Sequence, residues 1–135
     1  MEKNRIQTFY KEMYNLLKGK GINDTILNTY PDSLESASDS FVVVELPYSL
    51  RDIDISDYDV KNTYARVSFF AKDKIYKTSR MPNIKELERM VDDFIPIFPQ
   101  MGTRYSMMMP KVVIMPKKAD AHYHYTVVNV PIIFY

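Results

Sequence analysis

The densest group of potential metal ligands is an acidic arm between Leu50 and Asn62. Its acids alternate with apolar and polar residues and surround Tyr58: Asp52, Asp54, Asp57 and Asp59. Carboxylates at alternating positions are typical of a helix–loop–helix calcium site, which also needs a glycine at the sharp turn and a distal glutamate. Asp57 stands where the glycine should be, and Thr63 where the glutamate should be. The template fails, so we expect a solvated arm without a metal ion.

His122 and His124 are the only histidines, and their spacing places both on one face of a strand. Two imidazoles could ligate a metal if Asp120 joined them, but protein metal sites normally need three or more ligands. The neighbouring Tyr123 and Tyr125 favour an ordinary strand with alternating aromatic residues. The chain has no cysteine, which excludes thiolate sites and disulfides. The sequence therefore predicts no metal and no cofactor.

Signatures of catalysis are missing from the sequence. Only three glycines are present, too few and too scattered for a phosphate-binding loop: Gly19, Gly21 and Gly102. No Gly-x-Ser-x-Gly sequence marks a serine nucleophile. We therefore predict that the protein has no catalytic residues and is not an enzyme.

A modest cluster of cations follows the second long strand pattern: Lys72, Lys74, Lys77 and Arg80. The chain as a whole has 18 basic and 17 acidic residues, a formal charge of +1. Proteins dedicated to nucleic acids usually carry a strong basic excess. A solvated face explains the cluster better than phosphate contacts, and we expect no sequence-specific nucleic-acid binding.

Length and composition bound the class of protein. The 135 residues match one domain, covering 1–135, and 46% hydrophobic with 26% charged residues is ordinary for a globular fold. No apolar run approaches the roughly 20 residues that span a bilayer. The polar residues 1–5 lead into an amphipathic pattern, so we expect no signal peptide and no membrane association. The expected place is a cytosol, or a particle assembled there.

Two helices are expected from apolar residues at three-and-four spacing. The first has the stripe Ile6, Phe9, Tyr10, Met13, Leu16 and Leu17. The second runs from Asn83 to Ile95, where Asn83 can cap the first turn and Pro96 ends the helix. Its expected buried stripe is Ile84, Leu87, Val91, Phe94 and Ile95.

The β-prone segments are Phe41–Leu46, Thr63–Ala71 and two long apolar runs, Tyr105–Met115 and Tyr123–Tyr135. The two runs flank the polar turn 116–120 and predict a closing hairpin. Pro110 and Pro131 cannot donate to a ladder, so the hairpin should be bulged or free-edged there. The expected fold class is α+β, in the order α-β-β-α-β-β, with an antiparallel sheet and both helices on one face.

Eleven tyrosines and seven phenylalanines give the chain an aromatic character. Such residues are enriched at protein interfaces, and they also fill ordinary cores. We favour the core as their main place. A tyrosine-rich face could also form a ligand pocket.

Several local patterns together resemble the tail-terminator and tail-completion proteins of long-tailed bacteriophages. They are an N-terminal helix that ends at Lys18-Gly19-Lys20-Gly21, a polar loop with Tyr30-Pro31, the strand 41–46 closed by Pro47, a long arm, the strand 64–71, a helix from Asn83 and a closing hairpin. The resemblance covers nearly the whole chain. The proline-marked last hairpin and the aromatic C-terminus depart from it.

The resemblance implies a structural protein of a phage or prophage, located in the virion or the bacterial cytoplasm. Proteins of this group assemble as rings at the tail end or the head–tail joint, and they have no catalytic residues. The expected partners are further copies of the chain and other tail or connector proteins. If the subunits form a ring, the acidic arm, with Asp52, Asp54, Asp57, Tyr58 and Asp59, is the expected assembly surface: it either lines the lumen or joint, where it repels DNA phosphates, or meets a basic partner surface. A solvated hairpin is the alternative to both roles. The alternative is a small non-viral ligand-binding or enzymatic α+β domain with a tyrosine-rich pocket.

Overall fold

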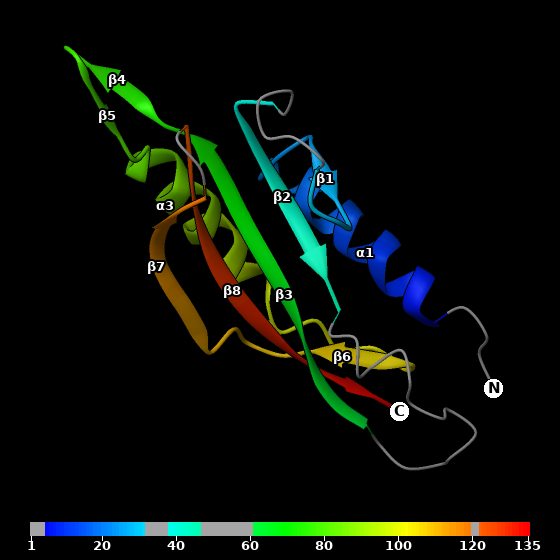
Figure 1. The fold of residues 1–135 in the computed structure, drawn as a ribbon. Coiled ribbons are helices and arrows are strands. Elements are labelled where there is room, and N and C mark those ends of the chain that lie inside the picture. The colour runs from blue at the N-terminus through cyan, green and yellow to red at the C-terminus, as the bar shows by residue number, and fades with distance from the viewer. Residues whose placement is uncertain (1–4, 32–37, 47–60, 120–121) are drawn as a thin grey trace.

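A computed structural model of the protein describes residues 5–31, 38–46, 61–119 and 122–135. Each of the two helices is followed along the chain by a run of strands (Figure 1). The helices are α1 (Arg5–Gly19) and α3 (Ile84–Phe94), which continues into the 3-10 turn η2 (Ile95–Ile97). The strands are β1 (Ile26–Leu27), β2 (Ser40–Glu45), β3 (Lys61–Lys72), β4 (Lys74–Tyr76), β5 (Ser79–Met81), β6 (Tyr105–Met107), β7 (Val112–Lys118) and β8 (Tyr123–Phe134).

The described residues form one large curled sheet and one small hairpin. The large sheet has the order β1-β2-β3-β8, and both β6 and β7 pair with the outer side of β8. The small sheet is the pair β4–β5. The sequence predicts the α+β class correctly. The predicted strand order is only loosely matched, because β1, β6 and the hairpin β4–β5 add strands to it.

The sheet is mixed rather than wholly antiparallel. Strand β1 pairs in parallel with β2, through Ile26 opposite Val42 and Leu27 opposite Val43. The remaining pairs of the large sheet are antiparallel. The connection between β1 and β2 returns the chain to the same direction, which apolar composition alone does not reveal.

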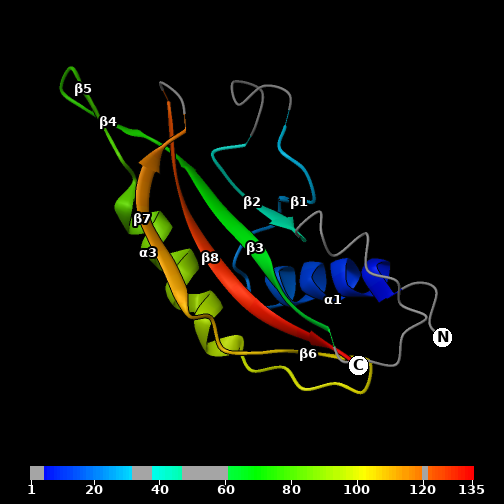
Figure 2. The ribbon, with the colours of Figure 1, turned by 60° about the horizontal axis from the view of Figure 1, so that its bottom comes forward.

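Both helices pack on one face of the sheet, as the sequence predicts (Figure 2). Alternate residues of β2, β3 and β8 point to this face, because successive strand side chains point to opposite faces. They join one core with Phe9, Met13 and Leu17 of α1 and with residues of α3. The sheet residues of this core are Val42, Val44, Ala65, Val67, Phe69, Ala71, Val128, Val130, Ile132 and Phe134.

Helix α3 starts as predicted, but its buried stripe differs from the predicted one. The Asn83 side chain accepts a hydrogen bond from the Glu86 backbone N–H at 3.3 Å, which caps the first turn. Leu87, Met90, Val91 and Phe94 are buried. Ile84 was expected in this stripe, yet it is 39% exposed. Its place in the first turn, beyond the edge of the core, is the reason.

The prolines shape the outer edge of β8. Strand β7 pairs with β8 as far as Val112 opposite Asn129, and β6 resumes the pairing at Met107 opposite Ile132. Pro131 therefore lies where this ladder is interrupted, which agrees with the expected free edge. The turn was expected at 116–120, but it starts later in the structure, because β7 continues to Lys118. A register shift between Ile114 and Lys117 interrupts the pairing of β7 with β8. Pro116, which has no N–H to donate, lies inside that shift.

The opposite face of the sheet holds a smaller aromatic cluster. The Phe41 and Phe70 rings stack at 4.6 Å between centroids, and Phe70 stacks on Tyr125 at 5.2 Å. Tyr123 and Val43 complete the buried part. Much of the aromatic content is thus core, as expected. Within the described residues, neither helix has the length and apolar character required to cross a membrane.

Candidate functional site

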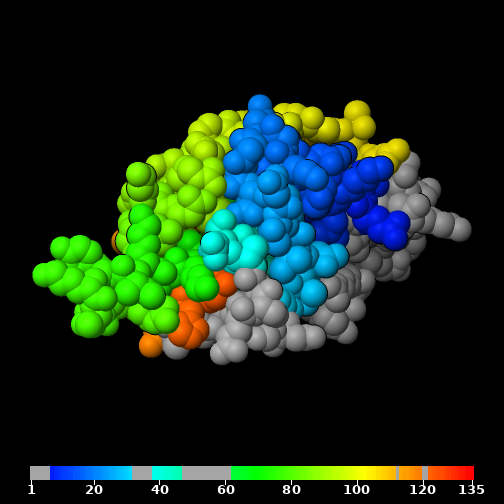
Figure 3. Space-filling view, turned by 90° about the horizontal axis from the view of Figure 1, so that it is seen from above, coloured from blue at the N-terminus to red at the C-terminus, as the bar shows by residue number. Residues whose placement is uncertain are grey.

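The β4–β5 hairpin projects from the body of the molecule. It follows β3 directly and extends away from both helices (Figure 1), and the space-filling view shows it as a protrusion (Figure 3). Every residue of β4 and β5 is exposed. Three of its side chains are large and apolar, with exposed fractions of 66% for Ile75, 63% for Tyr76 and 50% for Met81. An isolated two-stranded ribbon is only marginally stable in water, so this one depends on how its base is attached to the sheet.

Apolar groups stand on both sides of the ribbon. The register pairs Lys74 with Met81, Ile75 with Arg80 and Tyr76 with Ser79. Directly opposed residues share a face, so Tyr76 and Met81 lie on one face and Ile75 on the other. The Lys77 ammonium lies 5.7 Å from the centre of the Tyr76 ring. Such a ribbon can contact a partner on two sides at once.

The base of the hairpin is held by Asp73, the residue between β3 and β4. Its carboxylate accepts a hydrogen bond from His124 Nδ1 at 2.7 Å, and its backbone N–H donates to the His122 carbonyl at 2.7 Å. The Asp73 side chain is only 3% exposed. Both contacts tie the hairpin to the start of β8, so they set the direction in which the hairpin leaves the sheet.

The expectation that His122 and His124 lie on one face of a strand is wrong, because β8 begins at Tyr123 and His122 precedes it. His124 is instead engaged with Asp73. Among the residues that the structure describes, no three His, Cys, Asp or Glu side chains gather as metal ligands. The acidic arm, with Asp52, Asp54, Asp57, Tyr58 and Asp59, lies outside the described residues, as does Asp120.

Among the surface clefts elsewhere on the described part of the chain, three have similar volumes. A cleft of about 340 Å³ separates α1 from the segment before β6, and one of about 320 Å³ separates α1 from β1. The third, about 350 Å³, is the tyrosine-lined cleft expected for the ligand-binding alternative. Its walls are Tyr30, Pro31, Phe70, Lys118, Ala119 and Tyr125. All three are at the small end of the range for ligand pockets, roughly 300–1,000 Å³.

The first of these clefts has a carboxylate in its wall. The Tyr105 hydroxyl donates a short hydrogen bond to Glu12 Oε2, which joins β6 to α1. Burial, and then this bond, raise the pKa of Tyr105 above its usual range, while Arg104 acts in the opposite direction. Gly102 also lines the cleft and lies tightly against the backbone of Tyr105, since an added Cβ would lie 2.5 Å from the Tyr105 carbonyl oxygen. We call this site the Glu12 cleft.

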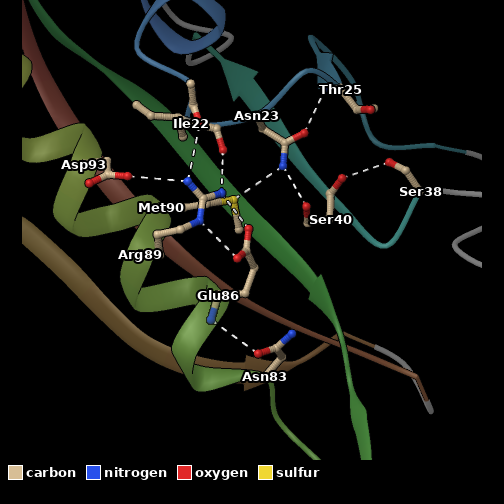
Figure 4. A network of polar contacts seen from close by, with 11 residues as sticks. Ile22, Asn23, Thr25, Ser38, Ser40, Asn83, Glu86, Arg89, Met90 and Asp93 are labelled. Atoms are coloured by element: carbon tan, nitrogen blue, oxygen red, sulfur yellow. Dashed lines mark hydrogen bonds and ion pairs between the residues drawn. The ribbon is translucent and has the colours of Figure 1, made fainter.

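Arg89 joins the end of α1 to α3 (Figure 4). Its guanidinium forms a fork with Glu86, at 2.6 and 3.0 Å, and contacts Asp93 at 3.4 Å. It also donates to the carbonyls of Gly21, at 3.3 Å, and Ile22, at 2.8 Å. The hydrogen bond with Glu86 is the main reason that the pKa of Arg89 is raised. These contacts satisfy two backbone carbonyls in the turn that follows α1.

Replacing Arg89 with Met should lower the free energy of unfolding by about 1–2 kcal/mol. The side chain is 40% exposed, so solvent screens the ion pairs and the two carbonyl contacts carry most of the effect. Urea titration followed by circular dichroism measures the change. Arg89→Lys is the matched control, which keeps the charge without the fork and should lose only part of the stability. Equal stability of Arg89→Met and the original chain would show that the network contributes nothing.

Comparison of the chain with protein-family models and with curated proteins finds no match. The function must therefore be inferred from the geometry of the hairpin and the clefts and from the resemblance in sequence. The hairpin was missed from the sequence as a structural unit, although its three cations were noticed as part of a cationic cluster. Each of its strands, 74–76 and 79–81, is too short to show a strand period in the sequence.

Proposed function

We propose that the chain is a structural assembly subunit, resembling phage tail-terminator and tail-completion proteins, which forms a ring at the tail end or the head–tail joint. The observation that carries the proposal is the β4–β5 hairpin, whose apolar side chains Ile75, Tyr76 and Met81 project into solvent. Exposed apolar side chains on a protruding element mark a protein contact. The proposal assigns no reaction to the chain and places it in the virion or the bacterial cytoplasm.

The charges of the acidic arm and of the hairpin also support assembly. Residues 74–81 contain three cations and no acid, whereas residues 52–59 contain four acids and no cation. Opposite charges in separate segments favour contact between copies and steer their association. Asp52, Asp54, Asp57, Asp59 and Tyr58 remain the proposed partners in assembly, either with another copy or with a tail protein.

The alternative, a ligand-binding domain, is favoured by the tyrosine-lined cleft. Phe70, Tyr125 and Lys118 line this cleft. Its small volume and the packing of Phe70 inside the aromatic cluster make it a weaker candidate than the hairpin. A ligand-binding domain of this kind would be a monomer, which separates it from an assembly subunit.

The test is the oligomeric state of the purified protein as its concentration is raised. We expect the original chain to form oligomers, and the double variant Ile75→Asp, Tyr76→Asp to associate at least about tenfold more weakly, because charges would then replace the desolvated apolar contacts. Sedimentation velocity and light scattering report the mass.

The matched control is the double variant Val113→Asp, Met115→Asp. It makes the same change in charge at exposed apolar positions of β7, and it should assemble normally. A chain that stays monomeric up to its solubility limit would contradict the proposal. So would normal assembly of the hairpin variant.

A further inference from the structure

The Glu12 cleft lies at the end of the molecule far from the hairpin. Figure 1 places β4 and β5 beyond one end of β3, whereas β6, which contributes Tyr105 and Met107 to the cleft, lies toward the other end. In the view from above (Figure 3), the hairpin and the segment before β6 are again on opposite sides. One chain cannot bring the two surfaces together, but two copies can.

The hairpin and the Glu12 cleft have complementary charge. The hairpin has Lys74, Lys77 and Arg80. The Glu12 carboxylate is the one charged group among the lining residues of the cleft, to which Asn15 and Gln100 add amide groups. Arg104, which acts on Tyr105 electrostatically, is not among those lining residues. By contrast, the other two clefts have lysines in their walls, Lys118 in one and Lys11 in the other. Of these three sites, the Glu12 cleft therefore suits a basic ribbon best.

The apolar parts of the two surfaces also match. The walls of the cleft include Leu16, Met101 and Met107, and Met101 is 68% exposed. Methionine side chains adapt their shape to a partner and pack well against aromatic rings. A volume of about 340 Å³ is small for a cofactor but suits one or two inserted side chains such as Tyr76.

We propose that the β4–β5 hairpin of one copy inserts into the Glu12 cleft of a second copy. The proposal depends on the assembly function given above and specifies its contact. Because two different surfaces meet, the contact is head-to-tail, and each added copy leaves one free hairpin and one free cleft. Such a contact closes into a ring where the rotation per copy permits, and otherwise extends as a filament.

Two substitutions at one exposed position test the contact. Met101→Lys should weaken association on the order of tenfold, because it places a cation against a basic hairpin, and Met101→Glu should strengthen it severalfold. The difference between the two variants should shrink as salt is added. Sedimentation velocity at several concentrations measures each, and matching thermal melts establish that both variants are folded.

A mixing experiment identifies the direction of the contact. The variant Ile75→Asp, Tyr76→Asp keeps its cleft, and Met101→Lys keeps its hairpin. An equimolar mixture should contain dimers and no larger species, because the one competent contact cannot be repeated. Each variant alone should remain mainly monomeric.

The outcomes separate this proposal from the assembly function. If the hairpin variant dissociates while Met101→Lys and Met101→Glu assemble like the original chain, the hairpin docks elsewhere and this proposal is wrong. The assembly function would then still stand. A monomeric original chain would instead contradict the assembly function itself.

Discussion

Replacing Phe94 with Ala is expected to lower the free energy of unfolding by about 3–5 kcal/mol, the range for emptying a large aromatic position. Phe94 is fully buried and is the point where α3 meets the sheet. Its ring lies edge-on to Phe69 of β3 at 5.2 Å and to Phe98 at 4.9 Å. The cavity would lie between a helix and a paired strand, so the surroundings could collapse only in part. Urea titration gives the change directly.

Ile84→Ala is the matched control in the same helix. It removes a large aliphatic side chain from a position that is 39% exposed, so its cost should stay below about 1 kcal/mol. Similar losses for both variants would mean that Phe94 contributes no more packing than the exposed Ile84, since alanine favours the helix at both positions. The two helix positions therefore distinguish the packing described here from a loosely attached helix.

The long periodic elements could be predicted from the sequence. Phe9, Met13 and Leu17 repeat at helical spacing and are all buried, because one stripe of α1 faces the sheet. The alternating residues of β3 and the cap at Asn83 were equally plain. The burial of Met90 was not predicted, because Val91 and Phe94 already formed an apolar stripe at helical spacing without it. The parallel pairing of Ile26 and Leu27 was missed because two residues show no period.

The hairpin could not be predicted because its turn lacks the usual residues. Two-residue hairpin turns need positive φ angles, for which glycine or asparagine is typical. Here Lys77 takes a positive φ of 56° and Thr78 follows it. Without a turn signal, the segment 74–81 showed only its cations. The cleft formed by Glu12 and Tyr105 joins residues that are 93 positions apart, a proximity that only the fold creates.

The placement of the hairpin follows from the exchange of partners at the end of β3. Strand β3 pairs with β8 as far as Lys72, which lies opposite Tyr123. The next strand, β4, begins at Lys74 and pairs with β5 instead. Asp73 lies at this exchange, and its contact with His124 is the polar link across it. An arm that must meet a partner in one orientation needs such a fixed base, because each degree of freedom lost on docking weakens the contact.

Replacing Asp73 with Ala is therefore expected to have two effects. It should lower the free energy of unfolding by about 1–3 kcal/mol, because His124 Nδ1 loses the acceptor that it has in the protein. It should also loosen the hairpin, so that trypsin cleaves faster after Lys74, Lys77 and Arg80. Mass spectrometry of a timed digest locates the cuts, and urea titration gives the stability.

Asp73→Asn and Asp92→Ala are the controls for the hairpin base. Asn retains an acceptor oxygen for His124 and should keep most of the stability and the resistance to trypsin. Asp92 is an exposed acid on α3, and its removal should change neither measurement. Assembly should weaken in Asp73→Ala even at concentrations and temperatures where the chain is fully folded, because a freely moving arm pays the entropy of ordering when it docks. Unchanged cleavage after Lys74, Lys77 and Arg80 in a folded Asp73→Ala protein would show that the side-chain pair does not hold the hairpin, and the direction of the arm would then be set by β3 and by the backbone bond from Asp73 to His122.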